Sequence, residues 1–373
     1  MKKILLFSAL VVFLLLIAGA IFAFYFVHKL NNLEDTQDLE KRVTAAAEKF
    51  LKEKKSVGLA IAIVQGEKSH LATYGWANKE AQIPVKEETI FEIGSISKVF
   101  TTQIGEILAQ KGVIDWNSTL AASLQSPFSF QDDKTTLLHL ATHTSGFPRL
   151  PQHFLDRMTD DCNPYSTLTQ ADLVAYLAAC KDKKEASLQA YDYSNFGSAL
   201  LGTILVQKSK KDYETLLQDE ICTRLGLKNT SLLVKDSTKF AIGYTENQEP
   251  TCHWDFPEFY AAGGIRSDIA DMGRFLKAQL SDNQDFKNTH APIFEAQGGK
   301  IGKGWHLDTS SDLILKMGDI VWHNGGTGGF RTYIGFSPEK NIGVVVLANQ
   351  SSAEVDNFAI KILAMTKQIS LSK

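Results

Sequence analysis

The sequence predicts an α+β fold in which both ends of the chain contribute strands to one antiparallel sheet. Apolar, β-branched runs lie near the start, at 57–64 and 69–77, and near the end, at 330–336 and 342–347. Between them, residues 95–284 are rich in leucine and alanine and have mostly helical periodicity. This order favours a mostly helical region inserted into the α/β part, with a functional site where the two meet.

The composition is that of an ordinary globular protein. The chain has 373 residues, of which 44% are hydrophobic and 22% charged, so it can bury a large core. Its length exceeds the size at which a single core usually stops growing, which predicts two cooperating subregions. The net charge is −3 and no long basic run occurs. We therefore expect no nucleic-acid partner, since phosphate binding needs clustered lysine and arginine.

The N-terminal segment predicts a membrane anchor. Two lysines precede a run over residues 4–27 whose only polar side chains are Ser8 and Tyr25. Such a helix spans the ~30 Å hydrocarbon layer at roughly 1.5 Å per residue. The competing interpretation is a cleavable signal peptide with a small-residue site at 18–20, but residues 21–27 stay apolar beyond that site. The positive start keeps that end in the cytoplasm, so we expect the body of the protein outside.

The predicted boundaries follow from these patterns. Residues 1–30 form the anchor or signal, residues 31–40 a polar tether and residues 41–373 one domain. A helix with apolar residues at helical spacing opens the domain at 41–54, and another closes it at 353–369. The strand pairs at the two ends of the domain are each joined by a short polar turn, at 65–68 and at 337–340.

The four cysteines do not indicate a metal site. Cys162, Cys180, Cys222 and Cys252 lack the CxxC spacing of zinc and redox motifs. An exported location permits disulfides, and four cysteines allow three full pairings. We expect small buried side chains with at most one bridge.

Ser95 is the first candidate for chemistry. Ser95 and Lys98 are three residues apart, so on a helix they share a face. A buried lysine with a lowered pKa can take the serine proton and make the hydroxyl nucleophilic. The same spacing recurs at 337–340 and 370–373, in a turn and at the chain end. Only Ser95 follows a glycine and opens an amphipathic helix; the structural alternative is a simple N-cap.

Two further segments could complete a site. Tyr193 is the only tyrosine followed two positions later by asparagine, Asn195, and this pair could move protons and orient a substrate, or simply form a turn before a helix at 196–207. His323-Asn324-Gly325-Gly326 begins a glycine-rich segment between two apolar runs. Glycines let a substrate backbone approach an edge strand, although a plain hairpin loop has the same composition.

Together, these segments and their surroundings resemble the class C β-lactamases and the related D,D-peptidases and esterases. The matching segments are FEIGSISKVFT at 91–101, LHLATHTSGFP at 138–148, YDYSNFG at 191–197, LGLKNT at 225–230, AAGGIRSDIADMGRF at 261–275 and HNGGTGGF at 323–330. The resemblance covers about residues 39–369. It implies a β-lactamase/transpeptidase-like fold for the domain at 41–373.

The resemblance also implies a role for each matched residue. Ser95 would be the acylated nucleophile, Lys98 its proton acceptor and Tyr193 the proton relay to the leaving group. The substrate would be bound by Asn195, His323, Asn324 and Gly325, and the backbone N–H groups of Ser95 and Gly326 would form the oxyanion hole. This chemistry needs no metal and no organic cofactor.

One position departs from the family pattern. Typical class C β-lactamases carry lysine where this chain has His323, and threonine where it has Asn324. An unperturbed imidazole, with a pKa near ~6.5, is mostly neutral at neutral pH. We therefore expect a substrate carboxylate to bind better as the pH falls toward 6. Histidine here resembles certain D,D-carboxypeptidases and esterases instead.

Three other signals do not indicate function. Ser281-Asp282-Asn283 spells a class A β-lactamase motif, but its polar surroundings predict a turn after a helix. His139 and His143 are four apart on a predicted helix, and the leucines around them favour packing over metal binding. The chain has no G-x-S-x-G, which argues against an α/β-hydrolase nucleophile elbow.

The sequence thus predicts an exported, membrane-tethered serine hydrolase acting on a peptide, β-lactam or ester bond. The expected place is the bacterial inner membrane, with the catalytic domain on the periplasmic or extracellular side, or outside the cell if the segment is cleaved. The expected partners are a small-molecule or peptidoglycan-peptide substrate and the lipid around the N-terminal helix. The alternatives are a small-ester hydrolase, a non-catalytic penicillin- or peptidoglycan-binding module, and a membrane-bound interaction protein that reuses the fold. The oligomeric state is left open.

Overall fold

The computed structural model describes residues 38–54, 56–131, 134–180, 183–187, 190–296, 299–309 and 316–371. The predicted anchor at 4–27 lies outside these residues. Among the residues that are described, none of the helices combines the length and the apolar character that a membrane crossing requires. Helix α2 spans Leu39–Glu53, so the last two residues of the predicted tether belong to it.

A nine-stranded sheet forms the centre of the molecule. Its order is β3-β2-β1-β13-β12-β11-β10-β9-β8, and every neighbouring pair is antiparallel. The strands are β1 Gly58–Gln65, β2 Lys68–Asn78, β3 Ile83–Pro84, β8 Phe294–Ala296, β9 Gly299–Ile301, β10 His306–Asp308, β11 Ile320–Gly326, β12 Arg331–Ser337 and β13 Ile342–Ala348. The prediction that both chain ends share one sheet is confirmed, because β1 pairs with β13 from Leu59↔Ala348 to Gln65↔Ile342.

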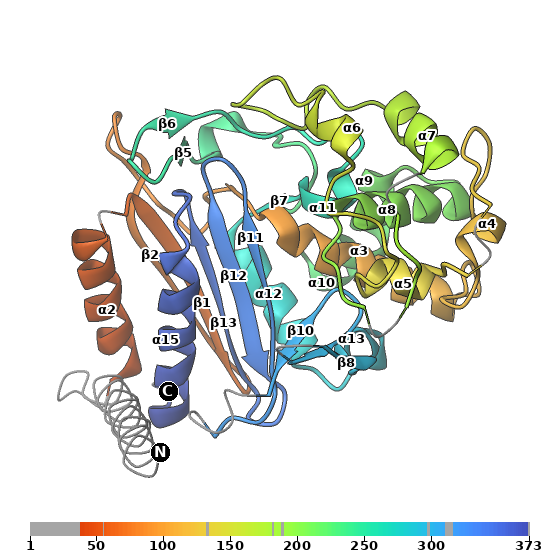
Figure 1. Ribbon diagram of the computed structural model, residues 1–373. Helices are drawn as coiled ribbons and strands as arrows, with labels where there is room; N and C mark the ends of the chain where they lie inside the picture. Colours follow the sequence, from red (N-terminus) through yellow and green to blue (C-terminus); the bar gives the residue numbers. More distant parts are fainter. Residues whose placement is uncertain are drawn as a thin grey trace, which may run out of the picture.

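One face of the sheet is covered by the two terminal helices. Helices α2 and α15 (Glu354–Gln368) lie side by side there (Figure 1). Their apolar residues pack on the outward residues of β1 and β13 in one core cluster, in which the rings of Phe50 and Phe358 are 4.5 Å apart. The strands at the middle of the sheet are buried on both faces, so they are continuously apolar rather than alternating.

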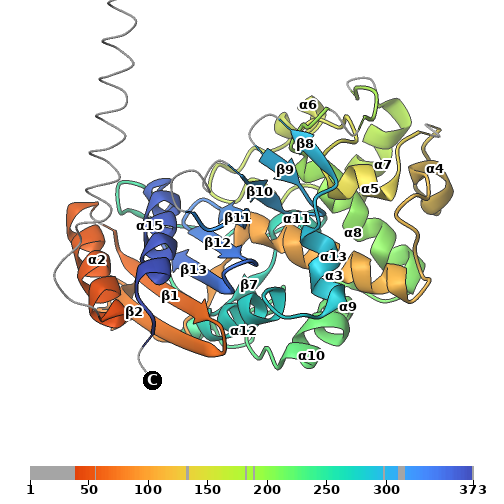
Figure 2. The ribbon, with the colours of Figure 1, turned by 90° about the horizontal axis from the view of Figure 1, so that it is seen from below.

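The opposite face carries the helical region (Figure 2). Helix α12 (Ile269–Gln279) packs directly on β1 and β13, and α3 (Ser97–Gln110) packs on α12 through the stacked rings of Phe100 and Phe275, 4.0 Å apart. The other α-helices are α4 Leu120–Ser123, α5 Leu137–Ala141, α6 Gln152–Leu155, α7 Gln170–Ala179, α8 Asn195–Ser209, α9 Tyr213–Leu217, α10 Thr223–Leu225, α11 Tyr260–Gly263 and α13 Gln284–His290. Two short strand pairs lie outside the main sheet: β4 (Phe91–Glu92) with β7 (Arg266–Ser267), and β5 (Gly243–Tyr244) with β6 (Pro250–Thr251).

Several local predictions can be compared with the structure. The turn at 65–68 is a tight hairpin with Gly66 at φ 60°, and residues 281–283 are the predicted turn, with Asn283 capping α13. One disulfide joins Cys162 to Cys252, with Cα atoms 5.5 Å apart. The predicted helix carrying both His139 and His143 is wrong: α5 ends at Ala141, and His143 has a φ of 58°. The sequence also missed β8, β9 and β10, since strands of three residues are too short for a periodic signal.

Candidate active site

Ser95 and Lys98 lie together where the sheet meets the helical region. A single 3₁₀ turn, Gly94–Ile96, leads into α3, so Ser95 is at the start of the helix and its side chain is half-buried. The Lys98 Nζ is 3.0 Å from the Ser95 Oγ and donates to the Ala262 carbonyl at 2.6 Å. Burial lowers the pKa of the Lys98 amine well below its ordinary value, and the positive charge of Arg149 adds to the effect. A neutral amine next to the hydroxyl can accept its proton.

Glycines allow the turn that carries Ser95 to contact strand β11. A Cβ on Gly325 would lie 2.0 Å from the Ile93 carbonyl oxygen, and one on Gly94 would lie 2.6 Å from the Gly326 nitrogen. Gly94 also has a φ of 52°, which favours glycine. The Thr332 hydroxyl donates to the same Ile93 carbonyl at 2.9 Å and ties the turn to the sheet. The backbone of Gly326 therefore lies beside the backbone that carries Ser95, and Gly326 is exposed.

Strand β11 is not an edge strand along its whole length, which corrects the sequence prediction. It lies between β12 and β10 in the sheet. However, its pairing with β10 runs only from Ile320 to Trp322, whereas its pairing with β12 continues from Val321 to Gly326. Residues 323–326 therefore form an open end of β11 that no described strand pairs on the β10 side. A short partner strand has the same effect as an edge.

Tyr193 is placed by the start of α8. Ser194 caps this helix: its Oγ accepts from the Gly197 N–H at 2.8 Å and donates to the Pro148 carbonyl at 2.8 Å. The Tyr193 ring is then 4.9 Å from the Lys98 Nζ. Burial raises the pKa of Tyr193 to about 12, and a hydrogen bond with the Ser95 hydroxyl opposes the increase. The phenol stays protonated at neutral pH and can donate its proton.

Asn195 is buried, and the hydrogen bonds of the Lys98 amine among the described residues do not include its amide. Its Nδ2 donates to the Tyr165 hydroxyl at 2.9 Å, and its Oδ1 has no hydrogen-bond partner among the described residues. An unpaired buried carbonyl oxygen is costly unless something else satisfies it. The predicted contact of Asn195 with a substrate stays a prediction, and Oδ1 is the atom that can make it.

His323 is neutral, which makes the expected pH dependence wrong. Its Nδ1 is 2.6 Å from the Asn324 carbonyl oxygen, so Nδ1 carries the proton and Nε2 is an acceptor without a partner among the described residues. Burial lowers the pKa of His323 well below its ordinary value, and His306 and Lys98 lower it further. The imidazole therefore gains no charge as the pH falls toward 6. The prediction assumed an ordinary imidazole pKa, whereas burial disfavours the charged form of the ring and lowers that pKa.

Asn324 belongs to a charged cluster on the other face of the sheet. Its Nδ2 donates to Asp356 of α15 at 2.6 Å rather than pointing freely at a substrate. The same Asp356 forms an ion pair with Arg331, whose Nε lies 2.8 Å from Oδ1. Neither Arg331 nor Asp356 was predicted, because strand neighbours and helix contacts cannot be read from sequence spacing.

Two further residues beside Tyr193, His143 and Arg149, were not predicted from the sequence as part of the site. His143 packs its ring 4.4 Å from the ring of Tyr193, and its Nδ1 accepts from the Ser194 N–H at 3.1 Å. Burial lowers the pKa of His143, with Lys98 and His306 contributing. Arg149 is exposed and lies over the Tyr193 ring, 5.1 Å from its centroid. The family-like segment at 138–148 contains His143 and ends one residue before Arg149. It was the sequence signal that could have identified both residues.

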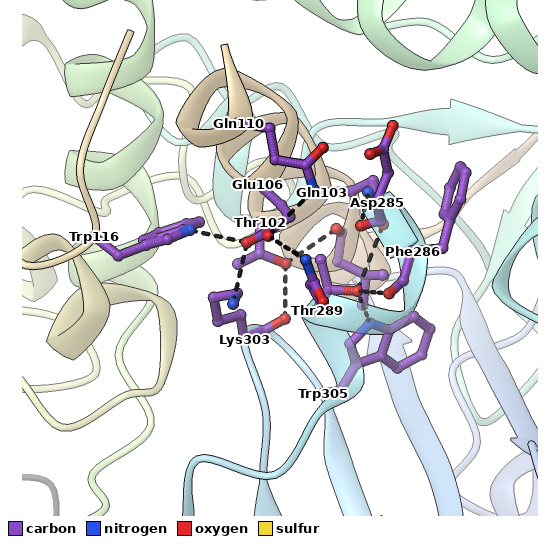
Figure 3. Close-up of polar contacts among 12 residues, drawn as sticks. Thr102, Gln103, Glu106, Gln110, Trp116, Asp285, Phe286, Thr289, Lys303 and Trp305 are labelled. Atoms are coloured by element: carbon purple, nitrogen blue, oxygen red, sulfur yellow. Dashed lines mark hydrogen bonds and ion pairs between the residues drawn. The ribbon is translucent and has the colours of Figure 1, made fainter. Parts of the chain in front are cut away.

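A buried polar network fixes the segment before β10 against α3 (Figure 3). Glu106 of α3 accepts from the indole of Trp116 at 2.9 Å and forms an ion pair with Lys303 at 3.1 Å. One turn earlier, the Thr102 hydroxyl donates to the Lys303 carbonyl at 2.9 Å. The network therefore positions His306, whose ring lies 5.3 Å from that of His323. Among the described residues, no group of three or more histidine, cysteine, aspartate or glutamate side chains could hold a metal ion.

The similarity of this chain to known proteins agrees with this geometry. The model of the family described as Beta-lactamase matches residues 43–365. The chain belongs to the β-lactamase family. It is 25% identical to a β-lactamase of Pseudomonas fluorescens over 84% of this chain and 94% of that protein. It is 28% identical to a β-lactamase of Yersinia enterocolitica over 79% of this chain and 82% of that protein.

Solved structures of the family have the same architecture. A β-lactamase/D-alanine carboxypeptidase from Pseudomonas syringae superposes with a TM-score of 0.77 at 25% identity, covering 87% of this chain and 98% of that one. A class C β-lactamase from Rhodobacter sphaeroides, at 24% identity, shares the fold with a TM-score of 0.73 over 87% of this chain and 98% of that one. The chain is thus a serine hydrolase of the β-lactamase/D-alanine carboxypeptidase type.

Proposed function

We propose that this family member forms an acyl-enzyme on Ser95 and acts on a D-alanyl peptide or a β-lactam. The observation that carries the proposal is the 3.0 Å contact between Ser95 Oγ and the Nζ of Lys98, whose pKa is lowered by burial. A non-catalytic binding module would have lost at least one reactive side chain, and Ser95, Lys98, Tyr193 and Asn195 are all present. The Pseudomonas syringae relative, a β-lactamase/D-alanine carboxypeptidase, supports this substrate class.

In the proposed acylation, Ser95 Oγ bonds to the substrate carbonyl carbon as its proton passes to the neutral amine of Lys98. The N–H groups of Ser95 and Gly326 hold the negative charge that develops on the carbonyl oxygen. The carbonyl then re-forms and the bond to the leaving nitrogen or oxygen breaks. The Tyr193 hydroxyl gives its proton to the leaving atom and receives one from the Lys98 ammonium.

Deacylation repeats the sequence with water as the nucleophile. Water bonds to the acyl carbon and loses a proton to the same base, and Ser95 leaves as its oxygen regains a proton. The neutral Nε2 of His323 can accept a hydrogen bond from the substrate, but it cannot attract a carboxylate as lysine would. This single difference favours a small-ester hydrolase as the second candidate function.

The test is the intact mass of the protein after exposure to a penicillin, with drug consumption followed in parallel and Ser95→Ala as control. A stable adduct that requires Ser95 supports a penicillin-recognising peptidase, and Ser95-dependent loss of the drug supports a β-lactamase. No adduct and no turnover, together with hydrolysis of p-nitrophenyl esters, would select the esterase. No Ser95-dependent reaction with either reagent would refute the acyl-transfer mechanism.

We also propose that residues 4–27 tether the enzyme to the bacterial inner membrane with its domain on the outer side. The apolar run and the two preceding lysines support this proposal. Membrane fractionation of cells expressing the full chain tests it, and protease treatment of intact spheroplasts tests the orientation. Recovery of the mature protein in the medium without residues 1–20 would instead indicate a cleaved signal.

A further inference from the structure

A buried carboxyl group lies where the turn that carries Ser95 meets the segment after β11. Glu92 is in β4, three residues before Ser95, and is 2% exposed. The rings of its neighbour Phe91 and of Phe330 meet edge to face, with their centroids 6.2 Å apart. The Phe330 carbonyl closes the turn after β11 by accepting from the Thr327 N–H at 3.0 Å. Strand β4 thus joins the two segments that supply the proposed oxyanion-hole donors.

The side chain of Glu92 faces the loop that carries Trp254 and the hydroxyl of Thr327. Its Oε1 accepts from the Trp254 N–H at 2.7 Å. Its Oε2 and the Thr327 Oγ1 are both buried and have no well-aligned hydrogen bond among the described residues, although the hydroxyl is near enough to affect the pKa of the carboxyl. The Trp254 Nε1 is also buried without a partner there, and a Cβ on Gly328 would lie 2.7 Å from it. Three unpaired polar atoms from three segments therefore lie beside residues 327–328.

The charged groups around Glu92 do not stabilise its ionised form. Arg266 lies directly across from Glu92 in the β4–β7 pair, but its guanidinium is used elsewhere. Its Nη2 donates to the Trp254 carbonyl at 2.6 Å and pairs with Asp255 at 3.4 Å. Asp255 is negative and opposes ionisation of Glu92, and burial lowers the pKa of His253, which therefore adds no positive charge at neutral pH. Burial accordingly raises the pKa of Glu92 to about 7.

We propose that Glu92 is a positioning residue of the oxyanion hole, which supports acylation when its carboxyl is protonated and weakens it when the carboxyl is ionised. The proposal rests on the acyl-transfer function proposed above. A protonated Oε2 can donate to the Thr327 Oγ1 and so hold the residue that follows Gly326. An ionised carboxylate instead places a buried negative charge near the carbonyl oxygen that becomes negative during acylation. In surroundings of low dielectric constant this charge opposes the reaction.

The alternative is that Glu92 only holds the Trp254 loop in place. A disulfide to Cys162 already fixes this loop at Cys252, two residues before Trp254. A purely structural role would depend on the contacts of the side chain and not on its charge. Glu92→Gln separates the two roles, because its amide has the shape of the carboxyl and stays neutral. It can accept from the Trp254 N–H and donate to a hydroxyl at every pH, as the protonated acid does.

The test is the pH dependence of kcat/KM for p-nitrophenyl acetate in the full-length enzyme and its variants. The ester is uncharged, so kcat/KM reports ionisations of the free enzyme. Lys98 and the buried histidines titrate in both proteins, so the ratio of kcat/KM in the unmodified enzyme to that in Glu92→Gln isolates Glu92. The control is Glu87→Gln, at an exposed glutamate shortly before β4. Circular dichroism at each pH checks that every protein is folded.

We expect this ratio to be constant in acid and to fall with a midpoint near pH 7, where Glu92 ionises. The fall should be about tenfold, because a unit charge about 10 Å from a developing charge changes a rate by roughly this factor at an effective dielectric constant of ~20. Thr327→Val removes the hydroxyl that lowers the pKa of Glu92, so the midpoint should move to higher pH. Glu92→Leu removes both contacts and should lower kcat/KM at every pH, whereas Glu87→Gln should keep the profile of the unmodified enzyme.

Three results would overturn the proposal. A ratio that stays constant within about twofold over the whole pH range would show that the charge of Glu92 has no effect on acylation. A midpoint that does not move in Thr327→Val, or a changed profile in Glu87→Gln, would assign the titration to another group. Ser95-dependent hydrolysis of the ester together with any of these results leaves the acyl-transfer function standing. No Ser95-dependent reaction with the ester or with penicillin at any pH refutes that function, and the role of Glu92 with it.

Discussion

The carboxyl group of Glu92 should make the stability of this enzyme depend on pH. Glu92 is in β4, three residues before Ser95, and is 2% exposed. Its Oε1 accepts from the Trp254 N–H at 2.7 Å, whereas Oε2 is buried without a hydrogen-bond partner among the described residues. Burial raises the pKa of Glu92 from 4.5 to about 7, and the nearby Thr327 hydroxyl and the charge of Arg266 only partly oppose the increase.

The sign and size of the effect follow from these two pKa values. Below pH 4.5 the carboxyl is protonated in both the folded and the unfolded chain. Between pH 4.5 and 7 the unfolded chain releases the proton while the folded chain keeps it, so rising pH favours unfolding. The free energy of unfolding should therefore lose about 3 kcal/mol across this interval through Glu92 alone.

The measurement is urea unfolding of the enzyme and of Glu92→Gln at pH 4.5, 6 and 7.5. Buried histidines and Asp268 titrate in both proteins, so the difference between the two isolates Glu92. The variant should gain about 3 kcal/mol relative to the unmodified protein between the lowest and highest pH. The exposed Glu87→Gln should show no such trend. A difference that stays constant within about 1 kcal/mol would refute the reasoning, since 1 kcal/mol is well below the change expected from linkage.

Three more predictions concern the site and its support. Lys98→Met should lower kcat/KM for acylation by about 10²–10⁴-fold, the usual value of a positioned base, and burst kinetics should locate the loss in acylation. Gly325→Ala should lower kcat by about tenfold or more, because the added Cβ would lie 2.0 Å from the Ile93 carbonyl oxygen; near-normal activity would contradict this. The matched control is Gly273→Ala, where the nearest atoms to the added Cβ are 3.4 Å away. Lys303→Met should lower the free energy of unfolding by about 3–5 kcal/mol, because the side chains of Lys303 and its partner Glu106 are only 10% and 8% exposed. The control Lys340→Met, at an exposed ion pair, should lower it by about 0–1 kcal/mol; equal losses on thermal unfolding would rule out the burial argument.

The outer parts of the fold could be predicted because their signals are local. The strands at 57–64, 69–77 and 342–347 are strongly apolar, and the structure places strands over the same residues. Their antiparallel pairing followed from the order of elements. Strand β10 could not be predicted in the same way, because its three residues, His306–Asp308, form a strand through pairing with β11 and β9, which are distant or equally short.

The candidate site was predicted in its chemistry and only partly in its geometry. Ser95 and Lys98 are three residues apart, so a helix alone brings them together, and the structure has them in contact. Asn195 was expected to bind a substrate, but its Nδ2 donates to Tyr165 from a distant segment, so only Oδ1 is left for that contact. His323 was assigned an ordinary titration, since no sequence pattern reports how much water reaches an imidazole.

The sequence by itself determined the class of protein and brought together the proposed nucleophile and the proposed base, because those depend on residue identity and on spacing within one helix or strand. Only the tertiary structure decided the electrostatics of the site. Burial lowered the pKa values of Lys98 and His323 well below their ordinary values, and the pairing of β11 with β12 placed Arg331 next to Gly326. Solvent exclusion and strand register bring together segments far apart in the chain, so neither can be read from any one segment.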